Sequence, residues 1–314
     1  MITRRPVIGL LVLWLCAGCG NFGAVTEIHP DGSWTRESRY STSDELSGPT
    51  ESFEVTIRED LEDYFDFTGV EKWEKDARNE LGGGVLIMSR RAQPGETLSD
   101  FALKGEDGKV IARNEVTVTR LSEKRFEYKE TLRWVGPIPE LLEEPSPERV
   151  QYFAGKLPED IEQADRVAKE LTRAAVQQYV LLLYGGTGQR PLLSEALVHR
   201  NVALRKLQAR LRKGITADLQ ERLKGHPQHD RLADIVAKIV DSEMIQQLGE
   251  KDEDKDVFND DRSLIALDFT AKLPGKIIET NGELDEVTGE IYWTLFAASP
   301  VLEDVVLRAV CEIE

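Results

Sequence analysis

The chain is poor in the residue types that most often carry cross-links, metal ions and nucleophilic catalysis. It has three cysteines and four histidines in 314 residues, and two of the cysteines, Cys16 and Cys19, lie within the first twenty positions. Cys311 is the only cysteine in the body of the chain, which excludes an internal disulfide there. Its apolar surroundings, DVVLRAVCEIE, predict a buried small side chain rather than a reactive thiol.

Positive charge and catalytic signatures are scarce as well. Lysine and arginine number 40 against 57 acidic residues, so the formal net charge is −17. A surface this acidic repels phosphate backbones, so we expect no nucleic-acid partner. Ser-His-Asp, H-E-x-x-H, G-x-S-x-G and S-x-x-K arrangements with a supporting context are missing, and we expect neither enzymatic activity nor a cofactor. A hydrophobic share of 40% still supports a packed core.

No segment is apolar for long enough to cross a bilayer, but a shorter run lies near the start. Val7–Leu15 is nine residues long, about half of the ~20 that a spanning helix needs. Two arginines precede it, and the small residues Ala17 and Gly18 followed by Cys19 come after it. This order resembles the signal sequence of bacterial lipoproteins, which is cleaved before a cysteine that receives a diacylglyceryl group.

The two early cysteines could instead form a redox or metal-binding C-x-x-C. That chemistry needs a helix start beside a βαβ pattern, and none follows. A plain signal peptide or an uncleaved anchor is the other alternative. We expect residues 1–18 to be a signal peptide, Cys19 to carry the lipid, and 19–23 to form a short anchor segment. The protein would then face the periplasm or the outside of the cell envelope, and Gly20, in place of a retention aspartate, favours the outer membrane.

Alternating patterns predict strands in the first part of the chain. Residues 25–40 predict a hairpin around Pro30-Asp31-Gly32, and 109–136 predict a second one with Val116 and Val118 on a buried face. FEVTIRE (53–59) predicts a strand, whereas 68–81 fits both a helix and a strand.

The helical period takes over after Pro137. Ser146-Pro147 is a helix start, and helices are predicted over 158–184, 192–223 and 229–247, with GGTGQRP as a helix stop. An acidic loop follows, and strand patterns return to the end of the chain. We therefore expect an α+β fold: an antiparallel β-sheet of N- and C-terminal strands (24–137 and 262–314) with an inserted block of about three to four long helices (138–261).

Two segments resemble the LppM-like domain of bacterial surface lipoproteins. Near the start, EIHPDGSWTRESRY contains Asp31-Gly32; near the end, LPGKIIETNGELDEVTGEIYWTLF contains Pro274-Gly275-Lys276, Asn281-Gly282 and Trp293. The resemblance covers about 60 to 80 residues and has no place for the helical block. It implies an envelope-anchored α+β domain, and some relatives are associated with lipid or glycolipid binding. From the residues alone, Asn281-Gly282 predicts a tight hairpin turn with positive φ, and Trp293 a core residue.

Two clusters could bind metal ions. The acidic loop from Asp252 begins like a calcium loop, but Val257 and Ser263 stand where that loop needs glycine and glutamate, so calcium binding there stays open. His226 and His229 with Asp230 offer too few neighbouring ligands for zinc, and we expect no metal site.

One basic stretch stands out against the acidic composition. HRNVALRKLQARLRK (199–213) contains no acid, and we take Arg205, Lys206, Arg210 and Lys213 as a candidate binding face. This face could contact anionic headgroups near the anchor or an acidic partner. Alternatively, it pairs with the protein's own acidic residues between Glu159 and Glu170.

These observations predict a bacterial lipoprotein held to a membrane through lipid on Cys19, with a non-catalytic binding or scaffolding role. A protein partner would bind the helical block. The first alternative is a binder or carrier of lipid or another hydrophobic ligand, which needs an apolar cavity. The second is an envelope hydrolase, for which the sequence offers no supporting residues.

Overall fold

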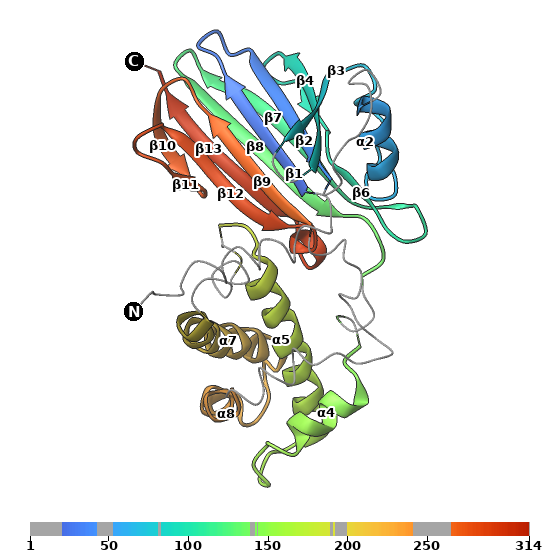
Figure 1. Ribbon diagram of the computed structural model, residues 1–314. Helices are drawn as coiled ribbons and strands as arrows, with labels where there is room; N and C mark the ends of the chain where they lie inside the picture. Colours follow the sequence, from blue (N-terminus) through green and yellow to red (C-terminus); the bar gives the residue numbers. More distant parts are fainter. Residues whose placement is uncertain are drawn as a thin grey trace, which may run out of the picture. The chain divides into compact units, whose positions relative to one another are not determined.

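The computed structural model describes residues 21–42, 53–80, 83–138, 142, 144–188, 191, 200–240 and 265–313. In this part of the chain, five α-helices and thirteen strands form the predicted α+β fold (Figure 1). Contacts divide the chain into two compact units, described separately below. The β unit comprises Met1–Pro137, Gly186–Arg190 and Asp260–Glu314, and the helical unit comprises Ile138–Gly185 and Pro191–Asn259.

The β unit contains two sheets rather than the single sheet that we expected. The seven-stranded sheet has the order β11 (Glu283–Leu284), β12 (Glu290–Phe296), β9 (Ala266–Lys272), β1 (Asn21–Ile28), β2 (Trp34–Ser41), β4 (Gly83–Ala92), β3 (Glu74–Glu80). The six-stranded sheet has the order β10 (Lys276–Thr280), β13 (Val305–Glu312), β8 (Arg125–Trp134), β7 (Val110–Ser122), β5 (Thr97–Leu98), and β6 (Ala102–Lys104) also pairs with β7. Both sheets combine strands from the two ends of the sequence.

Strand pairing is antiparallel with one exception. β1 and β9 run parallel, with Phe22 opposite Leu267 and Glu27 opposite Lys272. A parallel pair needs a long crossover connection, and the helical unit lies within that connection in the sequence. The prediction that the C-terminal strands complete the N-terminal sheet is confirmed, but not its purely antiparallel character.

A single hydrophobic core lies between the two sheets (Figure 1). The predicted alternation is confirmed on β7, where Val116 and Val118 are fully buried, and Cys311 on β13 is buried as well. Trp293 on β12 is 7% exposed and stacks on Tyr128 of β8, with ring centroids 5.5 Å apart. The two inner faces therefore interdigitate as in other β-sandwiches.

The predicted strand at 53–59 is wrong, because Phe53–Leu61 forms helix α2. Phe53, Val55 and Ile57 alternate like a strand, yet Phe53, Ile57 and Leu61 also recur with the helical period. The structure buries Ile57 and Leu61 in the core and leaves Val55 57% exposed, which is the pattern of a helix.

The segment that fitted both a helix and a strand is a strand from Glu74 onward. β3 (EKDARNE) is an edge strand that pairs with β4 and contains almost no residues with high β-propensity. Pairing with the apolar β4 thus outweighs local preference, and the charged side chains protect the exposed edge.

The predicted hairpin turn at Asn281-Gly282 is also wrong. β10 pairs with β13 and β11 pairs with β12, so the chain crosses here from one sheet to the other, and Gly282 does not adopt positive φ. A Cβ on Gly282 would lie 2.4 Å from a ring carbon of Trp293, so glycine is required by close packing instead.

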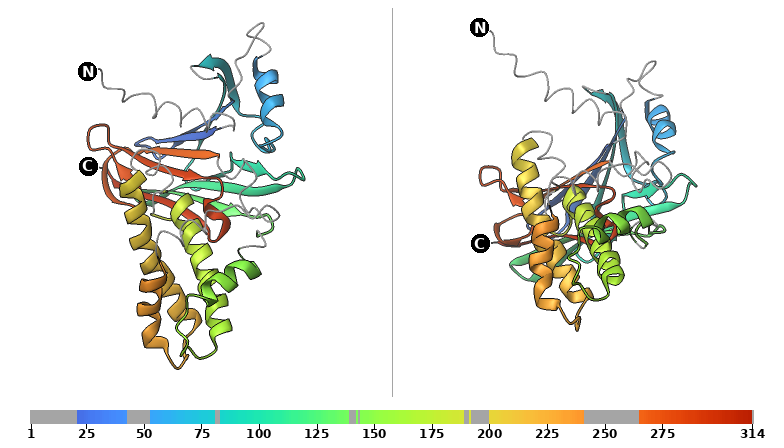
Figure 2. Two further views of the ribbon diagram at one scale, coloured as in Figure 1. Left: turned by 60° about the horizontal axis from the view of Figure 1, so that its bottom comes forward. Right: turned by 90° about the horizontal axis from the view of Figure 1, so that it is seen from below.

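The helical unit contains α4 (Pro147–Ala154), α5 (Ala164–Tyr184), α7 (Arg200–Arg222) and α8 (Leu232–Ile239), two long helices and two short ones among the described residues. The predicted start is confirmed, since Ser146 caps α4 and Pro147 is its first residue. Gly185 ends α5 with φ of 81°. α5 and α7 pack side by side in this unit (Figure 2), and Leu211, Ile215 and Leu219 of α7 are fully buried.

The stretch 186–190, which we expected within the helical insertion, belongs to the β unit. The hydroxyl oxygen of Thr187 accepts a hydrogen bond of 2.9 Å from the backbone N–H of Val306 on β13. Beside it, Asn281 donates to the carbonyl of Val306 at 2.7 Å and accepts from the N–H of Arg308 at 2.9 Å. These side chains thus satisfy the part of β13 that β10 does not reach.

Candidate functional site

The predicted lipidation site and the acidic loop both lie outside the described residues. Cys19 precedes the first described residue, Asn21, and 252–263 falls in an undescribed stretch, so calcium binding there stays a prediction. Of the expected anchor segment 19–23, residues 21–23 already belong to β1, which begins at Asn21. A single residue, Gly20, would therefore separate a lipid on Cys19 from the seven-stranded sheet.

We call the end of the β unit at which β1 starts the anchor end, after the lipid expected on Cys19, and the opposite end of the strands the far end. Asn21 lies opposite Ser41 at the anchor end, and Ile28 lies opposite Trp34 at the far end. The seven residue steps from Asn21 to Ile28 separate these two ends by about 23 Å. The direction of every other strand in this sheet follows from its register with β1 or with the neighbours of β1.

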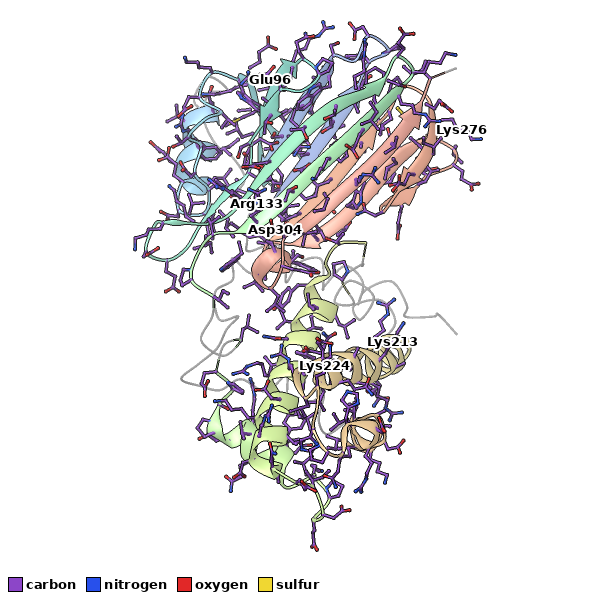
Figure 3. The ribbon with its side chains drawn as sticks, turned by 180° about the vertical axis from the view of Figure 1, so that it is seen from behind. Glu96, Arg133, Lys213, Lys224, Lys276 and Asp304 are labelled. Carbon is purple, nitrogen blue, oxygen red and sulfur yellow. The ribbon has the colours of Figure 1, made fainter. Side chains whose placement is uncertain are left out.

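The candidate basic face is only partly described. Arg210 and Lys213 are exposed on α7 (Lys213 is labelled in Figure 3), and neither has an ion-pair partner within the described part of the chain. Arg205 and Lys206 belong to α7, but their side chains are outside the described set. Arg212 binds inward, donating two hydrogen bonds to the carbonyl of Val240 at 3.2 and 2.9 Å.

The nearby acidic residues pair with other cations of the helical unit. Glu170 accepts from Arg173 at 2.9 Å and lies 3.5 Å from Arg222, while Asp160 pairs with Arg231 at 2.8 Å. Arg210 and Lys213, the two described residues of the basic face, therefore do not pair with the acidic residues between Glu159 and Glu170.

The two histidines of the helical unit have structural contacts. A ring nitrogen of His226 lies 3.0 Å from the carbonyl oxygen of Glu162, and one of His229 lies 3.1 Å from that of Gln220. Asp230 is fully exposed beside His229. Among the described residues, no group of three or more His, Cys, Asp or Glu side chains could hold a metal ion.

The densest cluster of charge lies inside the β unit and was not predicted from the sequence. Arg36 of β2 is completely buried between two carboxylates, Asp100 and Glu130, which are also buried. Its guanidinium donates to Asp100 at 2.7 and 3.2 Å and to Glu130 at 3.0 and 2.8 Å. Asn114 of β7 donates to both carboxylates at 2.6 Å. The cluster joins β2 of one sheet to β7 and β8 of the other.

Further donors complete the cluster. Tyr128 donates to Glu130, Ser38 donates to Asp100, and Arg36 also donates to the hydroxyl of Thr26 at 2.8 Å. Each carboxylate therefore accepts several hydrogen bonds, which is the condition under which buried charges are tolerated.

The two carboxyl groups titrate in opposite directions. Burial raises the pKa of Glu130, and the opposing charge of Arg36 does not fully offset this effect. Burial also acts on Asp100, but the charge of Arg36 and the hydrogen bonds from Arg36, Asn114 and Ser38 outweigh it and lower its pKa. Burial disfavours the Arg36 cation, yet Asp100 and Glu130 raise its pKa overall. We therefore describe the centre as an arginine held ionised chiefly by Asp100.

The sequence did contain a signal for this cluster. Trp34, Arg36, Ser38 and Tyr40 share the inner face of β2, and Glu130 lies on the same face of β8 as Phe126, Tyr128 and Leu132. A charged residue in the middle of an apolar alternating face marks a buried partner. Asp100 lies outside any strand, so its part in the cluster could not be predicted.

Two open grooves lie at the far end of the β unit. The first, of about 620 Å³, is lined by Thr35, Gly69, Glu71, Lys72, Trp73, Glu74, Ser89, Arg90 and Arg91. The second, of about 490 Å³, is lined by Lys272, Leu273, Gly275, Lys276, Ile277, Leu284, Glu286, Thr288, Gly289 and Glu290. Thr35 and Lys272 both lie opposite Glu27, near the end of β1, which places the two grooves at the far end.

The second groove is lined by apolar and charged residues of both signs. Lys272 and Glu290 pair at 2.7 Å on this rim, and Lys276, labelled in Figure 3, belongs to the edge strand β10. Val287, at the tip of the neighbouring turn, is 94% exposed. Charge of one sign does not dominate here.

None of the helices that the structure describes combines the length and apolarity of a membrane span. Comparisons of the chain with protein-family models, with curated proteins and with solved structures found no match.

Proposed function

We propose that this protein is a bacterial envelope lipoprotein, anchored through lipid on Cys19, that acts by binding at its outer surfaces rather than by catalysis. The observation that supports this proposal is the interior of the β unit. The space between the sheets is filled by packed side chains and by the paired Arg36 cluster, so a ligand finds its contacts outside. The lipid anchor itself rests on the N-terminal sequence.

The anchor is tested by replacing Cys19. In a bacterial host that lipidates exported proteins, we expect the full chain in the membrane fraction and Cys19→Ala in the soluble or uncleaved form. Labelling with radioactive palmitate should mark the wild type alone. Cys16→Ala is the matched control and should be labelled like the wild type, whereas equal labelling of Cys19→Ala would contradict the proposal.

The helical unit is the proposed site for a protein partner. Arg210 and Lys213 leave two exposed cations on α7, and an acidic surface would pair with them. In cross-linking of the full chain in intact cells, Arg210→Glu with Lys213→Glu should lose a specific cross-linked product. Lys224→Glu is the control, because Lys224 is 78% exposed in the same unit and lies 3.9 Å from Glu221 (Figure 3). Loss of the product in the control alone would contradict the proposal.

Lipid carriage is a second candidate, supported by the resemblance to the LppM-like domain. It would need an apolar cavity, whereas the described interior of the β unit holds a cluster of packed hydrophobic side chains and the paired Arg36. Native mass spectrometry of the full chain, released gently from detergent, distinguishes the candidates. A co-purified lipid near one per chain, beyond the lipid on Cys19, would favour carriage, and its absence would favour surface binding.

A further inference from the structure

The first groove forms where β3 stops short of its neighbour β4. The pairing of β3 with β4 ends at Glu74 opposite Ser89, so the last residues of β4, up to Ala92, pair with β2 alone. The chain before β3 turns away here, and Gly69 adopts a left-handed conformation with φ of 100°. A concave surface of about 620 Å³ results, large enough for a short chain of sugar rings or amino acids.

Three cations line this groove in an otherwise acidic protein: Lys72 from the turn before β3, and Arg90 and Arg91, consecutive residues of β4 whose side chains leave opposite faces of the strand. Arg90 pairs with Glu96, which Figure 3 labels, and Arg91 donates to the hydroxyl of Ser33 at 2.9 Å. Arg91 also lies 3.8 Å from Asp31, and both of these side chains are about two-thirds exposed. Exposed ion pairs contribute little free energy, so both arginines can exchange these partners for an anionic ligand at small cost.

Lys72 is free to bind a ligand without any exchange. It is exposed on the rim, and within the described residues it has no ion-pair partner. Guanidinium groups bind carboxylates and phosphates through paired hydrogen bonds, and an ammonium adds a point charge. Together the three side chains favour a ligand with more than one negative group.

The rest of the lining suits hydroxyl groups. Thr35 and Ser89 offer hydroxyls, and Glu71 and Glu74 offer carboxylates that accept hydrogen bonds from sugar hydroxyls. Trp73 lines the groove and is 5% exposed, and its indole N–H has no hydrogen-bond partner among the residues that the structure describes. A buried N–H without an acceptor is unfavourable, and a ligand oxygen could supply one after a small shift of the groove side chains.

We propose that this groove binds a saccharide that carries carboxylate or phosphate groups. Lys72, Arg90 and Arg91 pair with the anionic groups, and Glu71 and Glu74 accept from hydroxyls. An acidic peptide fits less well, because Trp73 is the only large apolar lining residue and the free edge of β4 is shorter than a typical strand.

The location of the groove favours, as its ligand, a polymer of the surrounding envelope over a lipid headgroup. The groove includes Thr35 opposite Glu27, six residue steps or about 20 Å from Asn21 along β1, and Asn21 would follow a lipid on Cys19 by two residues. This step rests on the proposed function, since it requires the anchor. The groove therefore faces away from the bilayer that holds the protein, and its ligand comes from the aqueous side.

Titration calorimetry of the full chain in detergent micelles tests the proposal. The probes are a galacturonate hexasaccharide, the neutral maltohexaose, glucose 6-phosphate, an acidic hexapeptide of glutamates, and phosphatidylglycerol vesicles. We expect the galacturonate to bind at least tenfold more tightly than maltohexaose and the peptide, and more weakly as salt is raised. Glucose 6-phosphate binding would identify phosphate as the anionic group, and the galacturonate identifies carboxylate; one of the two must bind.

Variants assign the binding to the groove. Arg90→Ala with Arg91→Ala should weaken binding at least tenfold, whereas Arg125→Ala should leave it unchanged, because Arg125 forms a comparable exposed pair with Glu312 elsewhere on the β unit. Glu74→Gln should strengthen binding of an anionic ligand, because the amide oxygen of glutamine still accepts from a hydroxyl while the repulsive charge is removed; a loss as large as in the double arginine variant would overturn the proposal. Equal loss in Arg125→Ala overturns the proposal.

Other outcomes would overturn it as well. These are binding of no saccharide probe, equal binding of maltohexaose, tighter binding of the peptide, or vesicle binding that the double arginine variant abolishes. The outcome is independent of the anchor, because Cys19→Ala protein should bind the same saccharide. If the anchor proposal fails, the saccharide proposal is thus unaffected, and if saccharide binding fails, the anchor proposal is unaffected.

Discussion

A few charged residues at the centre of the β unit determine how its two sheets pack. Arg36 reaches Asp100 and Glu130 from the opposite sheet, so three side chains fix how the two sheets lie against each other. Purely apolar faces can slide or repack, whereas a guanidinium between two carboxylates fits one arrangement. A buried ionic cluster contributes little net stability but makes the loss of any one partner costly.

The titration of Asp100 should be visible in the stability of the whole protein. Its pKa is below the ordinary value of 3.8 in the folded state, so it stabilises the fold above about pH 4 and this contribution is lost as the pH falls through its folded pKa. Asp100→Asn should lower the free energy of unfolding by about 3 to 5 kcal/mol at pH 7, and by less below pH 4. Urea denaturation between pH 2 and 7 measures the gap.

The control for this prediction is an exposed aspartate. Asp76 lies 3.5 Å from Arg78 with both side chains more than half exposed. Asp76→Asn should change the free energy of unfolding by well under about 1 kcal/mol. A gap for Asp100→Asn that stays constant down to pH 2 would contradict the sign worked out above.

Asn281 is the second residue with a disproportionate role. Its side chain accepts from the indole of Trp293 at 3.0 Å and from the N–H of Arg308, and it donates to the carbonyl of Val306. Asn281→Ala removes three hydrogen bonds and should lower the free energy of unfolding by about 2 to 4 kcal/mol. Asn281→Asp keeps the oxygen that accepts both of these hydrogen bonds but places a second carboxylate oxygen against the carbonyl of Val306, so thermal unfolding should place it below the wild type too. Wild-type stability of Asn281→Ala would refute this role.

Elements differ in how far the sequence determines them. The hairpin around Asp31-Gly32, the helix start at Ser146-Pro147 and the strand of Val116 and Val118 were predicted because local chemistry and tertiary environment agree there. α2 and β3 were not, because each sequence fits two periods and only contact with the rest of the sheet selects one. Asn281-Gly282 has the composition of a hairpin turn, but its neighbouring strands join different sheets.

The candidate site was harder to predict than the fold. The basic residues of α7 lie within one short segment of the sequence and could be recognised there, although Arg205 and Lys206 stay untested. The first groove combines Thr35 of β2, Arg91 of β4 and Trp73 from the turn before β3. No pattern within one segment brings such residues together, since their proximity is a property of sheet order.

The contact between α5 and α7 yields a prediction at the scale of elements. Gly214 lies inside α7, where glycine costs about 1 kcal/mol relative to alanine, and a Cβ there would lie 2.1 Å from the side-chain oxygen of Gln178 on α5. The double variant Gly214→Ala, Gln178→Ala removes the collision and keeps the gain in propensity. It should raise the free energy of unfolding of the helical unit by about 0.5 to 1 kcal/mol, as measured by urea denaturation followed by circular dichroism.

The single variants serve as its controls. Gln178→Ala alone should be close to the wild type, because its side chain is the movable partner. Gly214→Ala alone should be less stable than the double variant. A double variant less stable than Gln178→Ala would show that the backbone of α7, and not only Gln178, resists the added methyl group.

The whole molecule should unfold in two steps. Contacts separate the β unit from the helical unit, each with its own buried core, and such units often unfold independently. We expect two transitions in differential scanning calorimetry of the full chain. Leu307→Ala, in the core of the β unit, should lower one of them, and Leu211→Ala, in the core of the helical unit, should lower the other. A single transition that both variants shift equally would contradict this prediction.

The parallel pairing of β1 with β9 imposes a delay between the synthesis of β1 and its pairing with β9. Phe22 and Leu267 are neighbours in the sheet but 245 residues apart in the chain. At about 5 to 20 residues per second, synthesis takes roughly 12 to 50 s to supply the second strand after the first. During that interval the N-terminal strand can pair only with β2, and its other edge stays open beside the position where the lipid would be attached. Chaperones that cover exposed strand edges would therefore be needed most at the first strand, and longest.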